Sequence, residues 1–286
     1  MKRMLILLMM LCLLPVGAPA EFEDKFLPEG QEKVITEDVY RTRNIAVEIS
    51  RFRMDNSDVY VADVYVRDHR SLRRGFAGGA WYEAAKRIDD IAEAEGAIVA
   101  LTGDSSQHFA AGWAIGNGVV YRDTKNNKRD LYLMLRNGEM KGIQSEDMDH
   151  EALRAMSGDI WHTFLFGPIL LDENGKALTD FSESSVRRAN PRAAIGYYEP
   201  GHYCLVQVDG RSTESALEAG KKNRGMTLAQ LAVLMESLGC TSAYNLDGGQ
   251  SAAMWFQGKV ISTPYGGGRG IGDVVLVAES EWLVED

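Results

Sequence analysis

The chain has 286 residues, a hydrophobic content of 45% and a formal net charge of −10. This length and composition suit one large folded domain or two small ones, and they exclude a chain that is disordered throughout. Acidic residues are spread along the sequence rather than gathered in a tail, and the acidic balance argues against a nucleic-acid partner, which requires a basic surface.

The first 20 residues have the layout of a secretory signal peptide. Lys2 and Arg3 precede an unbroken apolar run over residues 4–14, and residues 15–20 (PVGAPA) end in small side chains. An apolar core of this length is too short to span a bilayer, which needs roughly 20 residues. We therefore expect cleavage after Ala20 and a secreted or cell-envelope protein with no integral membrane span after cleavage. Residues 21–33 then form a polar leader, and residues 34–286 form the folded domain.

Cys204 and Cys240 are the cysteines that remain after this leader, since Cys12 lies within it. One falls on a predicted strand and the other at the end of a predicted helix. Their spacing alone leaves open whether they form a disulfide.

Strand signals dominate the first third of the domain. β-Branched and aromatic residues with partial alternation predict strands at residues 46–49 and 59–66. Apolar side chains at helical spacing predict a helix over residues 81–95, which Gly96 ends. The apolar run over residues 97–102 predicts a short strand that leads into Gly103-Asp104.

The middle of the chain is predicted to be a β-rich meander. Strands are expected at residues 113–121, 131–135 and 169–171, with Asn-Gly pairs supplying the hairpin turns. One short helix is expected at residues 149–156.

The last third contains the clearest helix signal. Thr227 and Gln230 form a capping-box pattern, and Gly239 ends the helix. Strands are expected around it at residues 193–198, 203–208, 243–246, 254–256, 260–261 and 274–277. We find no internal repeat or linker, which favours one α+β domain with a mixed, largely antiparallel β-sheet core and a few packed helices.

Three predicted strands end in an aspartate beside a glycine: Asp104, Asp209 and Asp247. One such end is explained by a tight turn in which the aspartate caps its own backbone. Three of them can instead converge as carboxylates in one cleft. After Asp247, the pair Gly248-Gly249 lets backbone amides approach a bound anion without obstruction by a Cβ atom.

Other catalytic patterns fit the sequence less well. Residues 249–253 approximate the G-x-S-x-G elbow of serine hydrolases around Ser251, but that fold needs a histidine later in the chain. The last histidine is His202, so the elbow is set aside. The histidines are scattered without metal-ligand spacing, and we expect no metal site.

Arg192 lies just before a predicted strand. Its guanidinium suits either a surface salt bridge or a clamp that holds a phosphate through two parallel hydrogen bonds. Carboxylates together with an arginine suit a phosphate-bearing glycoside, because cleavage needs an acid or nucleophile at the anomeric carbon and positive charge at the departing phosphate.

The order of motifs in this chain resembles the phosphodiester glycosidase family. The motifs are Leu101-Thr102-Gly103-Asp104, Gly118-Val119-Val120, Gly167-Pro168-Ile169-Leu170, Pro191-Arg192-Ala193-Ala194-Ile195-Gly196, Asp209-Gly210-Arg211, Gly225-Met226-Thr227-Leu228, Asn245-Leu246-Asp247-Gly248-Gly249-Gln250-Ser251 and Arg269. The resemblance implies an α+β fold around mixed sheets. It also implies hydrolysis of a sugar linked through its anomeric oxygen to a phosphodiester, without a redox cofactor.

The resemblance also implies a set of site residues. The catalytic candidates are Asp247, Asp104 and Asp209. The substrate-binding candidates are Arg192, Arg211, Asn245, Gly248, Gly249 and Ser251. Gln250 stands where the family often has a glycine, and it can either narrow the pocket or contact the substrate.

Two functions from different classes follow. The first is an exported hydrolase that cleaves a sugar, for which N-acetylglucosamine is a candidate, from a sugar-1-phosphodiester of envelope polysaccharide or host glycan. The second is a non-catalytic envelope module that binds phosphorylated polysaccharide. Both have a phosphorylated glycan or sugar phosphate as partner, and neither needs a cofactor.

Overall fold

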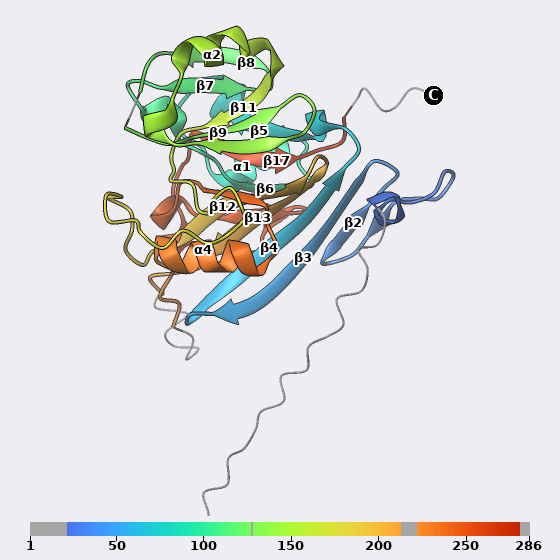
Figure 1. The fold of residues 1–286 in the computed structure, drawn as a ribbon. Coiled ribbons are helices and arrows are strands. Elements are labelled where there is room, and N and C mark those ends of the chain that lie inside the picture. Colours follow the sequence, from blue (N-terminus) through green and yellow to red (C-terminus); the bar gives the residue numbers. More distant parts are fainter. Residues whose placement is uncertain (1–21, 127, 213–221, 281–286) are drawn as a thin grey trace, which may run out of the picture.

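The computed structural model describes residues 22–126, 128–212 and 222–280, and its body consists of two β-sheets packed face to face (Figure 1). The larger sheet has seven strands in the order β1 (Val34–Ile35), β2 (Val39–Arg41), β3 (Ile45–Met54), β4 (Ser57–Val66), β13 (His202–Val208), β12 (Arg192–Glu199) and β14 (Ser242–Asn245). The smaller has five in the order β16 (Lys259–Val260), β15 (Met254–Phe256), β6 (Val99–Thr102), β17 (Asp273–Val277) and β5 (Leu72–Phe76).

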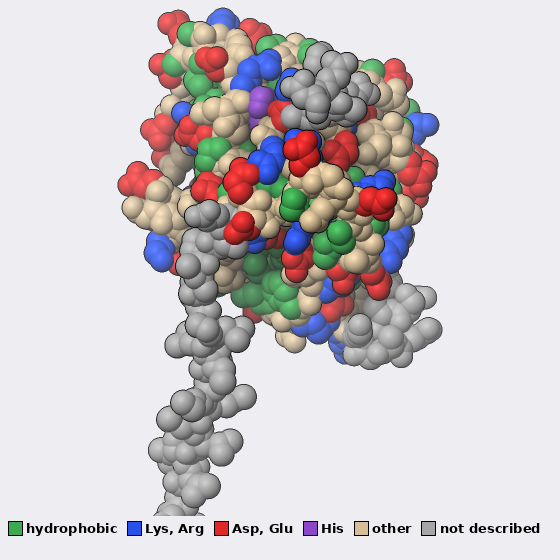
Figure 2. Space-filling model, turned by 90° about the vertical axis from the view of Figure 1, so that its right-hand side faces the viewer, with side chains coloured by type: hydrophobic (Ala, Val, Ile, Leu, Met, Phe, Trp, Pro, Cys, Tyr) green, Lys and Arg blue, Asp and Glu red, His purple; other side chains and the backbone are tan. Residues whose placement is uncertain are grey.

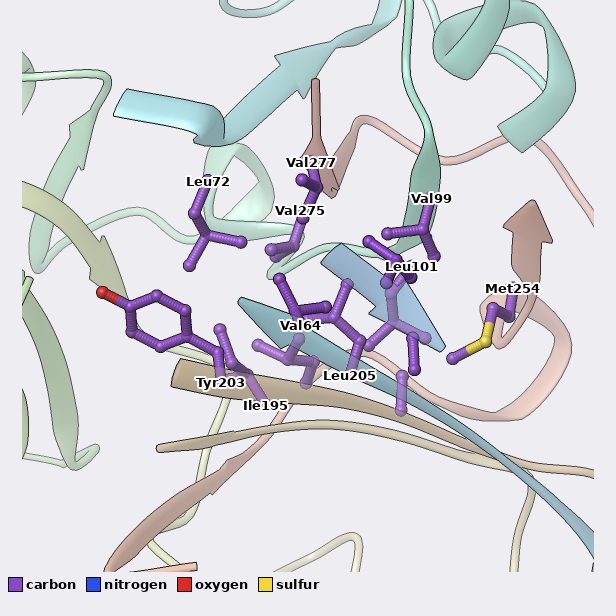
Figure 3. Close-up of a cluster of buried hydrophobic side chains, with 14 of the residues drawn as sticks. Val64, Leu72, Val99, Leu101, Ile195, Tyr203, Leu205, Met254, Val275 and Val277 are labelled. Carbon is purple, nitrogen blue, oxygen red and sulfur yellow. The ribbon is translucent and has the colours of Figure 1, made fainter. Parts of the chain in front are cut away.

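The core between the two sheets follows from the alternation of side chains along each strand. In β4, Ala62 and Val64 point toward the smaller sheet, whereas Val61 points to the opposite face. Leu205 and Leu101 meet in the inner layer, where Figure 3 shows the apolar side chains of both sheets gathered together. Each fully buried aliphatic side chain of this kind stabilises the fold by roughly 1.5–3 kcal/mol.

One helix covers the outer face of each sheet. Helix α4 (Leu228–Ser237) places Leu231 and Met235 on the larger sheet, and α1 (Ile88–Ala94) packs on the smaller one. Thr227 begins α4 with the predicted capping box, since its side chain accepts from the Gln230 amide and the Gln230 side chain accepts from the Thr227 amide. The order of layers is therefore helix, sheet, sheet, helix.

A smaller lobe lies over one end of this sandwich (Figure 1). Its core includes Trp113, Leu133 and Leu153. The lobe consists of the sheet β10 (Met140–Ile143), β9 (Leu131–Leu135) and β11 (Ile160–Phe164), the hairpin β7 (Trp113–Gly116) and β8 (Val119–Asp123), and helix α2 (His150–Ala155). Short 3₁₀ turns lie at Phe22–Lys25, His69–Ser71, Ala77–Gly79, Ser106–His108, Ser145–Asp147, Ser157–Asp159, Gly249–Ser251 and Tyr265–Gly267.

The fold confirms the expectation of a mostly antiparallel β-protein with few helices. Within the described ranges, every ladder between named strands is antiparallel, so the expected mixed character of the sheets is not seen there. The described residues contain three α-helices. This is an α+β architecture with a small helical share.

Two predicted elements were wrong in part. The helix expected over residues 81–95 begins only at Ile88, because Tyr82 has a left-handed backbone (φ 71°) and Trp81 stacks on Tyr121 with ring centroids 4.8 Å apart. The expected strand over residues 169–171 is reduced to two isolated bridges, which join Ile169 to Tyr244 and Leu171 to Ala177.

The N-terminal segment packs more closely than a loose polar leader. Phe26 is buried against Ala46 and Tyr65 of the larger sheet. The signal peptide expected at residues 1–20 lies outside the described residues. In the part of the chain that is described, no helix is both long and apolar enough to cross a membrane. The face drawn in Figure 2 carries acidic and basic side chains interspersed.

Candidate active site

Asp247 lies just beyond the end of β14, at the junction of the two sheets. Its amide donates to the carbonyl of Gly103 (3.1 Å), which follows β6 in the smaller sheet. Its carboxylate Oδ2 accepts from the Ser105 hydroxyl (2.8 Å), and Nη2 of Arg269 lies 3.5 Å away. Asp247 is 6% exposed, and the Arg269 side chain beside it is 55% exposed. The site therefore combines a nearly buried carboxylate with a guanidinium that reaches solvent.

The loop after β6 is held by the carboxylate of Asp273, at the start of β17. Asp273 accepts from the amides of Asp104 (3.1 Å) and Ser105 (2.8 Å). Ser105 has a left-handed backbone (φ 51°), which directs the chain into the next turn. A Cβ atom on Gly103 would lie 2.3 Å from the Asp273 carboxylate, so this close approach requires glycine. Asp273 thus places the serine that contacts Asp247.

Asp273 is paired with Arg74 of β5, and both side chains are fully buried. Arg74 donates to Asp273 through Nε (3.2 Å) and also to the Ser106 hydroxyl and the Thr163 carbonyl, each at 3.1 Å. No sequence pattern pointed to this pair. Asp273 could have been noticed, because it follows a glycine and directly precedes a predicted apolar strand. Arg74 could not, because nothing in the sequence distinguishes it from its neighbour Arg73.

Asp104 is fully buried and its carboxylate faces backbone amides. It accepts from the amides of Leu165 (2.8 Å) and Phe166 (2.7 Å), just after β11. Burial raises its pKa to about 7, while the charge of Arg74 lowers it and that of Asp273 raises it. Asp104 thus links the β6 loop to the smaller lobe.

The raised pKa of Asp104 predicts a pH-dependent stability. A carboxyl with a folded pKa near 7 and an unfolded pKa near 4 binds more protons in the folded state between these values, so its contribution is present below pH 4 and is lost as the pH rises to 7. Relative to Asp104→Asn, the wild-type free energy of unfolding should fall across this interval by at most about 1.4 kcal/mol per pH unit. Urea denaturation at pH 4, 5.5, 7 and 8 measures the difference, and parallel curves for the two proteins would contradict it.

Asp209 lies beyond the end of β13 and is 1% exposed. Its carboxylate accepts from the Thr263 amide (3.0 and 3.1 Å) and from the Tyr60 hydroxyl (3.3 Å). Burial raises its pKa to about 6, and the bond from the Thr263 amide counteracts this. Hydrogen bonds therefore join the loops of Asp104 and Asp247 directly, whereas the carboxylate of Asp209 is bonded to the Thr263 amide.

Thr263 belongs to the wall of a cavity of about 990 Å³ beside this cluster. Gln250, which immediately precedes Ser251, lies in the same wall. Arg211 has a left-handed backbone (φ 51°) and places its guanidinium over the Tyr265 ring, 5.5 Å from the centroid. Besides Thr263 and Gln250, the residues that line the cavity are Arg87, Ser212, Val260, Ser262, Pro264, Tyr265, Gly266 and Gly267. The cavity combines polar groups with one aromatic ring, a lining that suits a sugar.

Arg192 is 2% exposed and its guanidinium donates to backbone carbonyls. Nε donates to Met226 (2.8 Å), and Nη2 donates to Val186 (2.7 Å) and Arg188 (2.5 Å). Burial lowers its pKa to about 10. A phosphate contact at Arg192 would require these bonds to be exchanged, and the arginine that lies beside Asp247 is Arg269.

The remaining candidates support the loop around Asp247. Gly249 donates its amide to the Pro191 carbonyl (2.9 Å), and a Cβ atom on Gly248 would lie 2.6 Å from that oxygen. The Ser251 hydroxyl accepts from Nε of Arg269 (2.8 Å). Asn245 donates to the Gly167 carbonyl (2.7 Å), while its buried Oδ1 has no hydrogen-bond partner in the described residues.

A single family accounts for this fold and this arrangement of loops. The model of the phosphodiester glycosidase family matches residues 92–278, which include every site residue predicted from the sequence, and the chain belongs to that family. Among curated proteins, it is 26% identical to the SPbeta prophage-derived uncharacterized protein YomE of Bacillus subtilis, over 80% of this chain and 37% of that protein. It is 24% identical to the N-acetylglucosamine-1-phosphodiester alpha-N-acetylglucosaminidase of Bos taurus, over 70% of this chain and 38% of that protein.

The chain thus spans less than two fifths of the length of these curated relatives. Among solved structures, its fold is similar to the zebrafish N-acetylglucosamine-1-phosphodiester alpha-N-acetylglucosaminidase catalytic domain auto-inhibited by its pro-peptide. The TM-score is 0.63 at 20% identity, over 82% of this chain and 83% of that one. It is also similar to a putative exported protein of Burkholderia pseudomallei, with a TM-score of 0.51 at 15% identity, over 78% and 74% of the two chains.

Proposed function

We propose that this protein is an exported hydrolase that cleaves a sugar from a sugar-1-phosphodiester, in envelope polysaccharide or in a host glycan. N-acetylglucosamine is the sugar that we propose first, because two similar proteins carry it in their names. The observation that carries the proposal is the pairing of Asp247 with Arg269 in a chain of the phosphodiester glycosidase family. The cavity of about 990 Å³ reaches this pair through Gln250 in its wall, which precedes the Ser251 that accepts from Arg269.

The chemistry of the leaving group fits this pair. When the bond from the anomeric carbon to the phosphate oxygen breaks, the departing group is a phosphate monoester, whose second pKa is about 6. Such a group leaves as an anion and needs a positive charge more than it needs a strong proton donor. Arg269 supplies that charge at the exposed side of the site.

Asp247 supports the reaction at the sugar. A carboxylate at the anomeric carbon can attack it directly or can activate a water molecule, and both routes pass through a positively charged sugar that the carboxylate stabilises. Ser105 and Arg269 each contact Oδ2 of Asp247, which fixes the direction of the carboxylate. Asp104 and Asp209 bond to backbone amides, so we assign them to holding the walls of the site.

Arg269→Met should lower kcat/KM for the phosphodiester by roughly 10- to 100-fold, with a fall in kcat as well as a rise in KM, because the guanidinium contacts the phosphodiester and stabilises the charge that grows as the phosphate departs, and a charge-assisted contact to a phosphate contributes about 1.5–3 kcal/mol. Steady-state kinetics of sugar release measures both constants. Arg43→Met is the matched control, since Arg43 also pairs with an acid (Glu29, 3.7 Å) and its side chain is 56% exposed, but it lies near the N-terminus. Equal constants for Arg269→Met and the control would contradict the role of Arg269.

The function itself is tested by turnover. The purified protein is incubated with methyl-phosphoryl N-acetylglucosamine and with nucleotide sugars, and free sugar is measured by chromatography. Release of the sugar with an intact phosphate monoester supports the proposal. Binding of phosphorylated glycans without release from any substrate of a broad panel would instead support the non-catalytic module.

A further inference from the structure

Two cysteines that are 36 positions apart in the sequence meet inside the fold. Cys204 lies on β13, and Cys240 lies between the end of α4 and the start of β14. Their sulfur atoms are 3.5 Å apart, and the residues are 0% and 3% exposed. They are also the only cysteines of the chain outside the predicted signal peptide.

A glycine on the neighbouring strand makes room for the two sulfur atoms. Gly196 of β12 lies opposite Cys204 in the antiparallel ladder. A Cβ atom on Gly196 would lie 2.6 Å from Sγ of Cys204 and 2.5 Å from Sγ of Cys240. Both thiols therefore occupy the space that a side chain at Gly196 would fill, and they face each other there.

We propose that Cys204 and Cys240 form a disulfide when the protein folds outside the cytoplasm. An S–S bond is about 2.05 Å long, so the two sulfur atoms need to approach by about 1.5 Å from their present separation. The bond joins a central strand of the larger sheet to the segment that leads from α4 into β14, which ends two residues before Asp247.

The reaction requires an oxidant, which an extracytoplasmic compartment supplies as a thiol–disulfide oxidoreductase or as oxidised glutathione. One cysteine thiolate attacks the disulfide of the oxidant and forms a mixed disulfide. The second cysteine thiolate then displaces the oxidant. Together the two cysteine thiols lose two protons and two electrons, and the oxidant leaves as two thiols.

Burial determines when this reaction occurs. In the folded protein the oxidant cannot reach either sulfur atom, because both lie under α4 and Met235. The bond therefore forms during folding, before α4 docks on the larger sheet. The experiment must for this reason be done on protein that has folded in an oxidising environment.

The test uses the full chain, exported through its own leader and purified without reductant. The protein is unfolded in guanidinium chloride, alkylated with iodoacetamide before and after reduction, and digested for mass spectrometry. The expected result is that Cys204 and Cys240 are alkylated only after reduction, and that the unreduced digest contains one peptide joining the two. In Cys240→Ser, Cys204 should be alkylated without reduction.

Thermal unfolding provides a second readout. Closing a loop of this length with a disulfide raises Tm. Because a reductant cannot reach the buried bond in the folded protein, the wild type is unfolded and refolded with and without reductant, and the protein refolded with reductant should have a Tm lower by roughly 5–10 °C. The Tm of a Cys204→Ala/Cys240→Ala variant should not respond to reductant. Alkylation of both cysteines in the unreduced protein, repeated after refolding in a glutathione redox pair, would overturn the proposal.

Discussion

Asp247→Asn should lower kcat for sugar release by about a thousandfold or more while the fold is kept, because the amide cannot attack the anomeric carbon, accept a proton from water or stabilise a cationic sugar. The substitution preserves the shape of the side chain, and its amide oxygen can still accept from the Ser105 hydroxyl. We therefore expect a small change in Tm and a nearly unchanged affinity for the phosphorylated substrate. Kinetics with methyl-phosphoryl N-acetylglucosamine and differential scanning calorimetry separate the two effects.

The matched control for this substitution is Asp90→Asn. Asp90 is an exposed aspartate in the first turn of α1, on the outer face of the smaller sheet. Its replacement should leave kcat within about twofold and cost at most about 1 kcal/mol, the size of a helix-dipole contribution. If Asp247→Asn retained wild-type kcat on a substrate that the wild type cleaves, Asp247 would have no role in the catalytic step.

Arg74→Met should destabilise the protein by about 3–5 kcal/mol, which corresponds to roughly 10 °C in Tm. Removing the guanidinium leaves the fully buried carboxylate of Asp273 without its counter-charge. Arg73→Met is the control: Arg73 is the preceding residue of the same strand and is only partly buried, so its replacement should cost less than about 1 kcal/mol. Urea denaturation measures both values.

The interaction energy between Arg74 and Asp273 can be measured with a double-mutant cycle that adds Asp273→Asn. If the two charges interact directly, the double variant is less destabilised than the sum of the single variants, by about 0.5–3 kcal/mol. Asp273→Asn should also reduce activity, because Asp273 accepts from the amides of Asp104 and Ser105 and so positions the hydroxyl that contacts Asp247. Additive free energies would mean that Arg74 and Asp273 act independently.

Strand ends that are marked by neighbouring residues could be predicted from the sequence. Asp104 and Asp247 follow short apolar runs and stand beside glycines, and the structure links their loops through Ser105 and Gly103. The capping box at Thr227 was predicted for the same reason, since all its atoms lie within one helical turn. Local patterns therefore predicted the largely antiparallel architecture and the meeting of these two loops.

Features that depend on long-range burial could not be predicted in this way. Arg74 and Arg73 are equivalent in the sequence, and only the packing of β5 against the smaller lobe decides which of them is buried. Arg192 was proposed as a phosphate clamp because its motif precedes a strand, but which carbonyls surround a guanidinium is set by segments distant in sequence. The contact between Cys204 and Cys240 has the same cause, as it needs α4 docked on the larger sheet.

The position of Asp247 at the junction of two sheets has a consequence for how this protein can vary. Asp247 follows a strand of the larger sheet, whereas Gly103 and Ser105 follow a strand of the smaller one. Two hydrogen bonds join these strand ends, one of 2.8 Å from the Ser105 hydroxyl and one of 3.1 Å to the Gly103 carbonyl. A substitution in the apolar layer between the sheets, such as Leu101 or Leu205, would shift one partner relative to the other. Activity would then depend on the spacing of the two sheets. We therefore expect substitutions in this layer to occur together, so that one compensates for another, and not singly.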